Sequence, residues 1–211
     1  MNEASSPINP QGTRSPGRPR SEEARVAVLD ATRTLLGKTR VRDLTIDAIA
    51  QESGVARATI YRWWANKNAV VIDTFIKLML PSTPTPDAAS AMDAMAKHLA
   101  LLVKQYRGEL GQMVAEILAE GQTDAVLRDA FREGFFKHRR AAVREVVERG
   151  MASGEFAAEL NVEIALDMLY GAVYFRLLMG HGHLDARFAR ELADTARAFL
   201  CSHTGRTHPV Q

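Results

Sequence analysis

The polar and basic residues that follow Gly54 have the types and the spacing needed to bind DNA. Five of them lie within eleven positions, with no acidic residue among them: Arg57, Thr59, Tyr61, Arg62 and Lys67. Arginine binds guanine edges or phosphate, threonine contacts a base or a thymine methyl, and a tyrosine hydroxyl bonds phosphate. This cluster therefore offers nucleic-acid recognition.

Catalytic or metal-binding patterns are weak by comparison. The six histidines are scattered, and His181-x-His183 beside Asp185 lies in a glycine-rich stretch that favours an exposed turn over a metal site. Cys201 is the single cysteine, so no internal disulfide is possible. We expect no cofactor, no metal and no enzymatic activity.

The elements that must position the basic cluster are two short helices joined by a glycine turn. Thr45 can cap the first helix, whose apolar residues Ile46, Ile49 and Ala50 share one face. Gly54 can adopt the positive φ that ends a helix. A second helix over residues 57–64, with Ile60 buried, completes a helix-turn-helix whose second helix enters the major groove.

This stretch resembles the TetR-type (TetR/AcrR) family of transcriptional regulators. The resemblance covers about residues 25–75, and it is carried by Leu44-Thr45-Ile46-Asp47-Ala48-Ile49-Ala50, Gly54-Val55, Ala58-Thr59-Ile60-Tyr61, Trp64 and Asn66-Lys67. Two positions depart from the family pattern: Ala56 stands where serine is frequent, and Ala65 where proline is frequent. The missing oxygen cap at Ala56 costs about 1 kcal/mol of local helix stability.

The basic cluster and the resemblance together give the expected DNA-contacting residues. They are Thr45, Arg57, Ala58, Thr59, Tyr61, Arg62, Trp63 and Lys67, with Arg18 and Arg20 in a flexible basic arm over residues 1–21. Such an arm can lie in an adjacent minor groove or along phosphates, and a merely solvated tail is an equal alternative. Lys67 is expected in the first turn of the next helix, beside backbone N–H groups that could bind a phosphate.

Composition and charge set the class of the remaining chain. The 211 residues suit one or two small domains, 46% of them are hydrophobic, and the net charge is only +2. Residues 1–24 contain no apolar signal segment, and the apolar run 168–179 is interrupted by Arg176 and too short to span a membrane. A cytoplasmic protein without membrane contact is the expectation.

Apolar periodicity predicts an all-α fold of about nine helices, without strands. The expected domains are a helix-turn-helix domain at 22–66, a connector helix at 67–80, a helical effector-binding and dimerisation domain at 81–203, and a tail at 204–211. Ser21, Asn66, Asp87, Asp124, Asn161 and Asp185 are the expected helix caps. One long helix is expected after Asp124, with Phe131, Phe135 and His138 on the same face.

The larger domain concentrates methionine and aromatic residues that suit either an apolar ligand pocket or a plain core. The resemblance implies an effector cavity, for which the candidates are Phe75, Met95, Leu99, Met113, Ile117, Phe131, Phe135, Met168 and Tyr170. His98 and Glu116 could orient a ligand, although an exposed position is expected for each.

The combined prediction is a ligand-responsive transcriptional regulator. It would act as a repressor that binds a palindromic operator in double-stranded DNA as a homodimer, through its last two long helices, and would be released by a small apolar effector. The alternatives are a constitutive DNA-binding protein without effector, and an all-helical enzyme with an accessory DNA-binding module.

Overall fold

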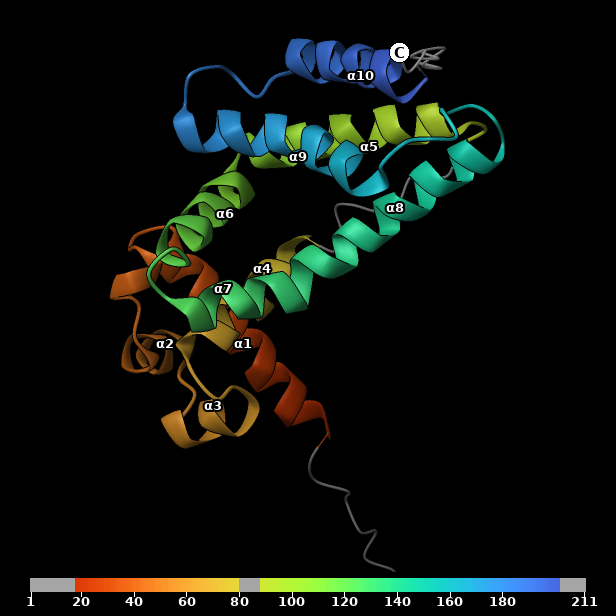
Figure 1. Ribbon diagram of the computed structural model, residues 1–211. Helices are drawn as coiled ribbons and strands as arrows, with labels where there is room; N and C mark the ends of the chain where they lie inside the picture. The colour runs from red at the N-terminus through yellow and green to blue at the C-terminus, as the bar shows by residue number, and fades with distance from the viewer. Residues whose placement is uncertain (1–17, 80–87, 202–211) are drawn as a thin grey trace, which may run out of the picture.

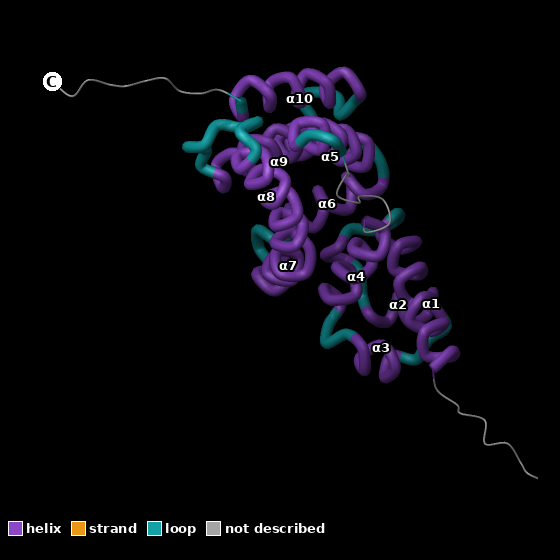
Figure 2. Tube along the Cα trace, turned by 90° about the vertical axis from the view of Figure 1, so that its right-hand side faces the viewer, coloured by secondary structure: helices purple, strands orange, loops and turns teal. Residues whose placement is uncertain are grey.

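A computed structural model describes residues 18–79 and 88–201, and every regular element within these ranges is a helix (Figures 1 and 2). The lower part of Figure 1 is the smaller, N-terminal one. Its elements are α1 (Arg18–Leu36), the 3-10 turn η1 (Val41–Asp43), α2 (Ile46–Ser53) and α3 (Arg57–Trp63), followed by α4 (Lys67–Met79).

The larger part follows in the chain; its helices α5, α9 and α10 lie above α4 in Figure 1, and its helix α7 lies beside α4. It contains α5 (Ala91–Tyr106), α6 (Glu109–Glu120), α7 (Ala125–Phe131), the π-helical segment η3 (Arg132–Phe136), α8 (Lys137–Ala152), α9 (Val162–Met179) and α10 (Ala186–Leu200). Because α7, η3 and α8 run on without a break, the described helices number nine when these count as one. The predicted all-α class is confirmed.

Most predicted helix caps are present. The side chains of Thr45, Asn66, Asp124, Asn161 and Asp185 each accept a hydrogen bond from the backbone N–H three residues later. Two helix starts differ from the prediction: α1 begins at Arg18 rather than at Ser21, and α5 is capped by Ser90 rather than by Asp87. Residues 1–17 of the arm, the proline-rich connection 81–86, Asp87 itself and the tail 204–211 lie outside the described residues.

The buried stripe of the long helix passes through other residues than the one predicted at position 138. Phe131, Phe135, Arg139 and Val143 follow one another at intervals of four residues, which places them along one face of the helix. His138, predicted on the same face, is exposed. The prediction for His138 is therefore wrong, because the buried stripe continues from Phe135 by a step of four residues and not of three.

Helix α4 lies between the two parts and belongs to the core of both. It packs against α1 on one side and against α6, α7 and η3 on the other. Four apolar residues of α4 are fully buried, namely Val70, Val71, Phe75 and Met79. Apolar side chains of α4 are thus covered by both parts. None of the described helices has the length and apolar character needed to cross a membrane.

Gly111 provides a direct test of the packing between α5 and α6. A Cβ added at Gly111 would lie 1.9 Å from the backbone oxygen of Tyr106. Because this oxygen belongs to the backbone, the clash cannot be relieved by rotating a side chain. We expect Gly111→Ala to destabilise the protein by roughly 1–3 kcal/mol or more, measured by urea unfolding. In the control Gly37→Ala the nearest atom is at 3.5 Å. Equal stabilities for the two variants would contradict this packing.

Candidate nucleic-acid interface and ligand-responsive region

The predicted helix-turn-helix forms as expected from its local sequence. The Thr45 hydroxyl oxygen accepts from the Ala48 N–H at 3.1 Å and fixes the start of α2. Gly54 ends α2 with φ +68°, a conformation that glycine adopts without steric cost. After this turn, α3 lies at the lower end of the molecule in Figure 1, far from α10.

Helix α3 turns a polar and basic face to solvent. Arg57, Ala58, Tyr61 and Arg62 are exposed, Thr59 and Trp63 are half-buried, and the Ile60 side chain is fully buried beneath them. The Ala56 position carries no side-chain cap, as its residue type requires. The exposed groups have the dimensions and chemistry of a major-groove reading face.

An open groove of about 510 Å³ runs beside α3 and brings together four of the predicted contacts, Thr45, Arg57, Tyr61 and Lys67. Asp47 also lines it, and its carboxylate binds the Arg57 guanidinium at 2.8 Å. Both side chains are more than 60% exposed, so this ion pair contributes little stability and a phosphate or base can replace it. Sequence reasoning missed Asp47 as a group that holds Arg57 in the DNA-free protein.

Lys67 has a different environment from the one predicted. Its ammonium group donates to the backbone oxygens of Arg42 at 2.6 Å and of Val41 at 3.1 Å. These bonds tie the start of α4 to the η1 turn and favour a structural role for Lys67 over a phosphate contact. Arg18 and Arg20 lie in the first turn of α1 rather than in an extended arm.

A polar contact between three helices holds α3 in place. Asp73 on α4 accepts hydrogen bonds from the Trp64 indole N–H at 2.8 Å and from Arg25 on α1 at 3.2 Å. The Arg25 guanidinium also lies 5.9 Å from the centre of a Trp64 ring. Trp64, the residue that follows α3, is therefore fixed directly to α4 by a hydrogen bond.

In the larger part, most of the predicted effector residues are buried. Phe75 on α4, Phe131 on α7 and Phe135 on η3 form one aromatic cluster, in which the Phe75 and Phe135 ring centres are 4.7 Å apart. The other buried members are Met95, Leu99, Met113, Ile117 and Tyr170. Met168 is 52% exposed on α9, outside this buried group, because it lies on the opposite face of that helix.

A polar cluster that the sequence prediction missed adjoins these residues. His98 is 3% exposed rather than on the surface, its Nε2 lies 3.1 Å from the Tyr170 hydroxyl, and its Nδ1 lies 3.1 Å from Arg139. The hydroxyls of Tyr106 and Tyr174 bond to each other at 3.1 Å. Burial, and then the nearby Arg139 charge, lowers the pKa of His98 to about 3, so the imidazole is neutral at physiological pH. Glu116, by contrast, is exposed as expected.

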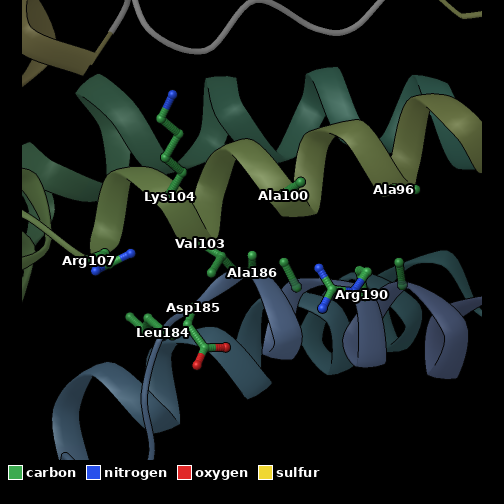
Figure 3. A pocket seen from close by; sticks show the side chains of 11 residues that line it. Ala96, Ala100, Val103, Lys104, Arg107, Leu184, Asp185, Ala186 and Arg190 are labelled. Atoms are coloured by element: carbon green, nitrogen blue, oxygen red, sulfur yellow. The ribbon is translucent and has the colours of Figure 1, made fainter.

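A second hollow lies between α5 and α10 and is open to solvent. It has a volume of about 510 Å³ and is lined by small apolar side chains such as Ala100 and Ala186, with the basic residues Arg107 and Arg190 beside them (Figure 3). Helix α10 packs against α5 and α9. No residue of α4, the helix that contacts α3, lines this hollow. The buried aromatic cluster, which includes Phe75 of α4, is therefore the nearer of the two to α3.

Comparison with known proteins agrees with both parts of this geometry. The family model for bacterial regulatory proteins of the tetR family matches residues 28–74, and the model for a tetracyclin repressor-like C-terminal domain matches residues 85–196. The chain belongs to the TetR family. The expectation from the helix-turn-helix residues is confirmed, and the match also covers the larger domain.

Individual relatives of this TetR-family regulator are regulators as well. It is 33% identical over 180 residues to the HTH-type transcriptional regulator YdeS of Bacillus subtilis, covering 85% of this chain and 91% of YdeS. The crystal structure of the TetR-family regulator SCO0332 superposes with a TM-score of 0.71 at 29% identity, covering 85% of this chain and all of the other. FadR from Bacillus subtilis, crystallised with stearoyl-CoA, has a TM-score of 0.70 at 19% identity, covering 84% of this chain and 99% of its own, a likeness of fold. The protein is a DNA-binding transcriptional regulator.

The reading face of α3 yields a specificity prediction. Arg57→Ala should lower the preference for a selected DNA site over random DNA by about 1–3 kcal/mol, because a base contact is lost. The measurement is fluorescence anisotropy with a site selected from a random library, at fixed salt. Arg197→Ala, which removes an exposed arginine from α10, is the matched control and should leave the preference intact. An unchanged preference in Arg57→Ala would remove Arg57 from base recognition.

Proposed function

We propose that this TetR-family regulator is a repressor that binds a palindromic operator as a homodimer and is released by a small effector with an apolar body. The observation that carries the proposal is the double packing of α4. Through Asp73 it holds the end of the recognition helix, and through Phe75 it contacts the aromatic cluster of the larger domain. One rigid element thus joins a DNA-reading helix to a region rich in apolar side chains.

The exposed face of α9 supports the homodimer. Five large apolar side chains of this helix are 50–64% exposed, namely Ile164, Met168, Phe175, Leu178 and Met179. Four of them, with Gly171, follow i, i+3 and i+4 spacing along a single stripe, and a Cβ at Gly171 would meet no atom within 4 Å. A solvent-exposed stripe of this kind is typical of a protein–protein interface, and a two-fold axis lets it pair with itself.

The homodimer was predicted to form through the last two long helices, α9 and α10, and the exposed apolar residues favour α9 for this role. Phe188 and Leu192 of α10 are buried within the chain, where α10 packs on α5. The unpartnered apolar surface therefore belongs to α9. A dimer built on it carries two α3 helices, which read two half-sites and give the specificity that one short helix lacks.

Release by an effector follows from the same connection. A ligand that enters beside Phe131 and Phe135 displaces rings that pack against Phe75, and α4 then shifts relative to α1. FadR, crystallised with stearoyl-CoA, shares this fold and supports a ligand-responsive domain here. A constitutive DNA-binding protein is the competing reading, and it requires no such coupling.

The dimer is tested by placing a charge in the α9 stripe. Phe175→Glu should shift sedimentation at micromolar concentration from dimer to monomer, because two like charges would be buried across the axis. It should also weaken binding to the full palindrome more than to a single half-site. Val126→Glu changes an apolar residue that is 58% exposed on α7, and it should remain dimeric. If the wild-type protein sediments as a monomer both with and without DNA, the proposed homodimer is wrong.

The repressor mechanism is tested by reciprocal titration. A compound that lowers operator affinity must bind the operator complex more weakly than the free protein, by the same factor. We expect such a compound among apolar molecules of the size of a C8–C18 chain, found by thermal shift and measured by calorimetry with and without operator. If every compound that binds has equal affinity for the two states, the protein is a constitutive DNA-binding protein.

A further inference from the structure

The hollow between α5 and α10 has the size and the lining of a small-molecule site. Its volume of about 510 Å³ lies within the range of ligand pockets, roughly 300–1,000 Å³. Both helices contribute side chains to it, and the loop before α10 adds Leu184 at one end (Figure 3). Val103 and Leu184 are buried, so the hollow reaches down to the apolar interior of the larger domain.

Alanine residues on the facing sides of the two helices create this space. Their spacing of three or four residues places them on one face of each helix, namely Ala96 and Ala100 on α5 and Ala186, Ala189 and Ala193 on α10. Because an alanine side chain ends at Cβ, helices that pack together leave a gap where longer side chains would meet. The walls of the hollow are therefore methyl groups, which an apolar molecule can cover.

Two arginine side chains give the hollow a positive charge. Arg107 follows the end of α5 and Arg190 is on α10; both are exposed, and in Figure 3 the Arg190 guanidinium lies in the gap between the helices. Neither arginine forms an ion pair with any residue in the described ranges 18–79 and 88–201. By contrast Arg187, three residues before Arg190, binds Glu191 at 2.7 Å.

The single carboxylate among the described lining residues does not balance this charge. Asp185 caps α10 and accepts a hydrogen bond from the Phe188 N–H at 2.8 Å. This backbone hydrogen bond is the main cause of the lowered pKa of Asp185, so its negative charge is stabilised by the start of α10. Lys104 also lines the hollow, but its side chain points away from α10 in Figure 3.

We propose that this hollow binds an organic anion with an apolar body and one negative group. The negative group pairs with Arg190 in the gap, Arg107 adds attraction from the end of α5, and the apolar body covers the alanine methyl groups. Guanidinium groups suit such a ligand, because they bind planar anions through parallel hydrogen bonds and stack on aromatic rings. The site goes beyond the proposed function, since no residue of α4 lines it and the repressor mechanism does not require it.

The charge requirement is tested with two fluorescent probes, anilinonaphthalene sulfonate and N-phenylnaphthylamine, which share a ring system and differ in the sulfonate. Fluorescence titration of the full chain at low salt should give about threefold to fivefold tighter binding of the sulfonate, the effect of an exposed ion pair. This difference should shrink as NaCl rises from about 50 to about 500 mM. Arg190→Gln should remove most of it, whereas Arg197→Gln changes an exposed arginine of α10 outside the hollow and should keep it.

The location is tested by filling the hollow from either side. Ala100→Phe on α5 and Ala186→Phe on α10 each place a ring in the space, and both positions are exposed, so neither ring is forced into the core. Each variant should abolish saturable binding of both probes. The matched control Ala141→Phe, at an exposed position of α8 outside the hollow, should bind them as the wild type does.

Several results would overturn the proposal. It is wrong if neither probe binds saturably, or if the neutral probe binds as tightly as the sulfonate. It is also wrong if both filled variants keep the circular dichroism and the sulfonate affinity of the wild type, because the probe then binds elsewhere. If Ala100→Phe instead converts a dimer into a monomer in sedimentation, the hollow is a contact between two copies of the chain. Operator binding is measured separately, so failure of this site leaves the proposed repressor in place.

Discussion

The structure depends on the burial of α4 from both sides. Val70 and Phe75 are fully buried although they belong to a helix between two parts, because α1 covers one face and α6, α7 and η3 cover another. Ion pairs reinforce the junction, with Arg33 on α1 binding Glu109 on α6 through two hydrogen bonds of 2.8 and 2.7 Å. Close-packed contacts of this kind cannot deform continuously, so a shift on one side is transmitted to the other.

Two neighbouring residues in the middle of α4, Asp73 and Phe75, make different kinds of contact. Toward α3 the contact is polar and directional, through Asp73 and the Trp64 indole, which fixes orientation. Toward the larger domain Phe75 makes an aromatic and apolar contact with Phe131 and Phe135. Asn68 adds a bond of 2.8 Å to Asp124, the cap of α7. Helix α4 is therefore joined to α3 by a hydrogen bond of fixed direction and to the larger domain mainly by packed rings.

The charged residues of the surface and of the interior lie in different surroundings. The α3 face is basic, and its Arg57 is held by an exposed carboxylate that DNA can replace. The interior of the larger domain instead contains Arg139 and a neutral His98, in surroundings where a charge costs far more than at the surface. Surface charge on α3 therefore serves association with a large polyanion.

The sequence by itself determined the helix-turn-helix, the caps at Thr45 and Asp124 and the all-α class, because each depends on residues within one or two turns of each other. It could not place Met168, since apolar residues occur all round α9 and only packing decides which face is covered. Nor could it place His98 on α5, whose burial depends on contacts with Arg139 of α8 and Tyr170 of α9. Arg139 was missed because the sequence places an arginine on the surface by default, whereas the packing of α8 on α5 brings Arg139 to His98. The buried polar cluster of His98, Arg139 and Tyr170 was thus decided by the tertiary structure alone, because its residues come from three helices that are distant in the sequence.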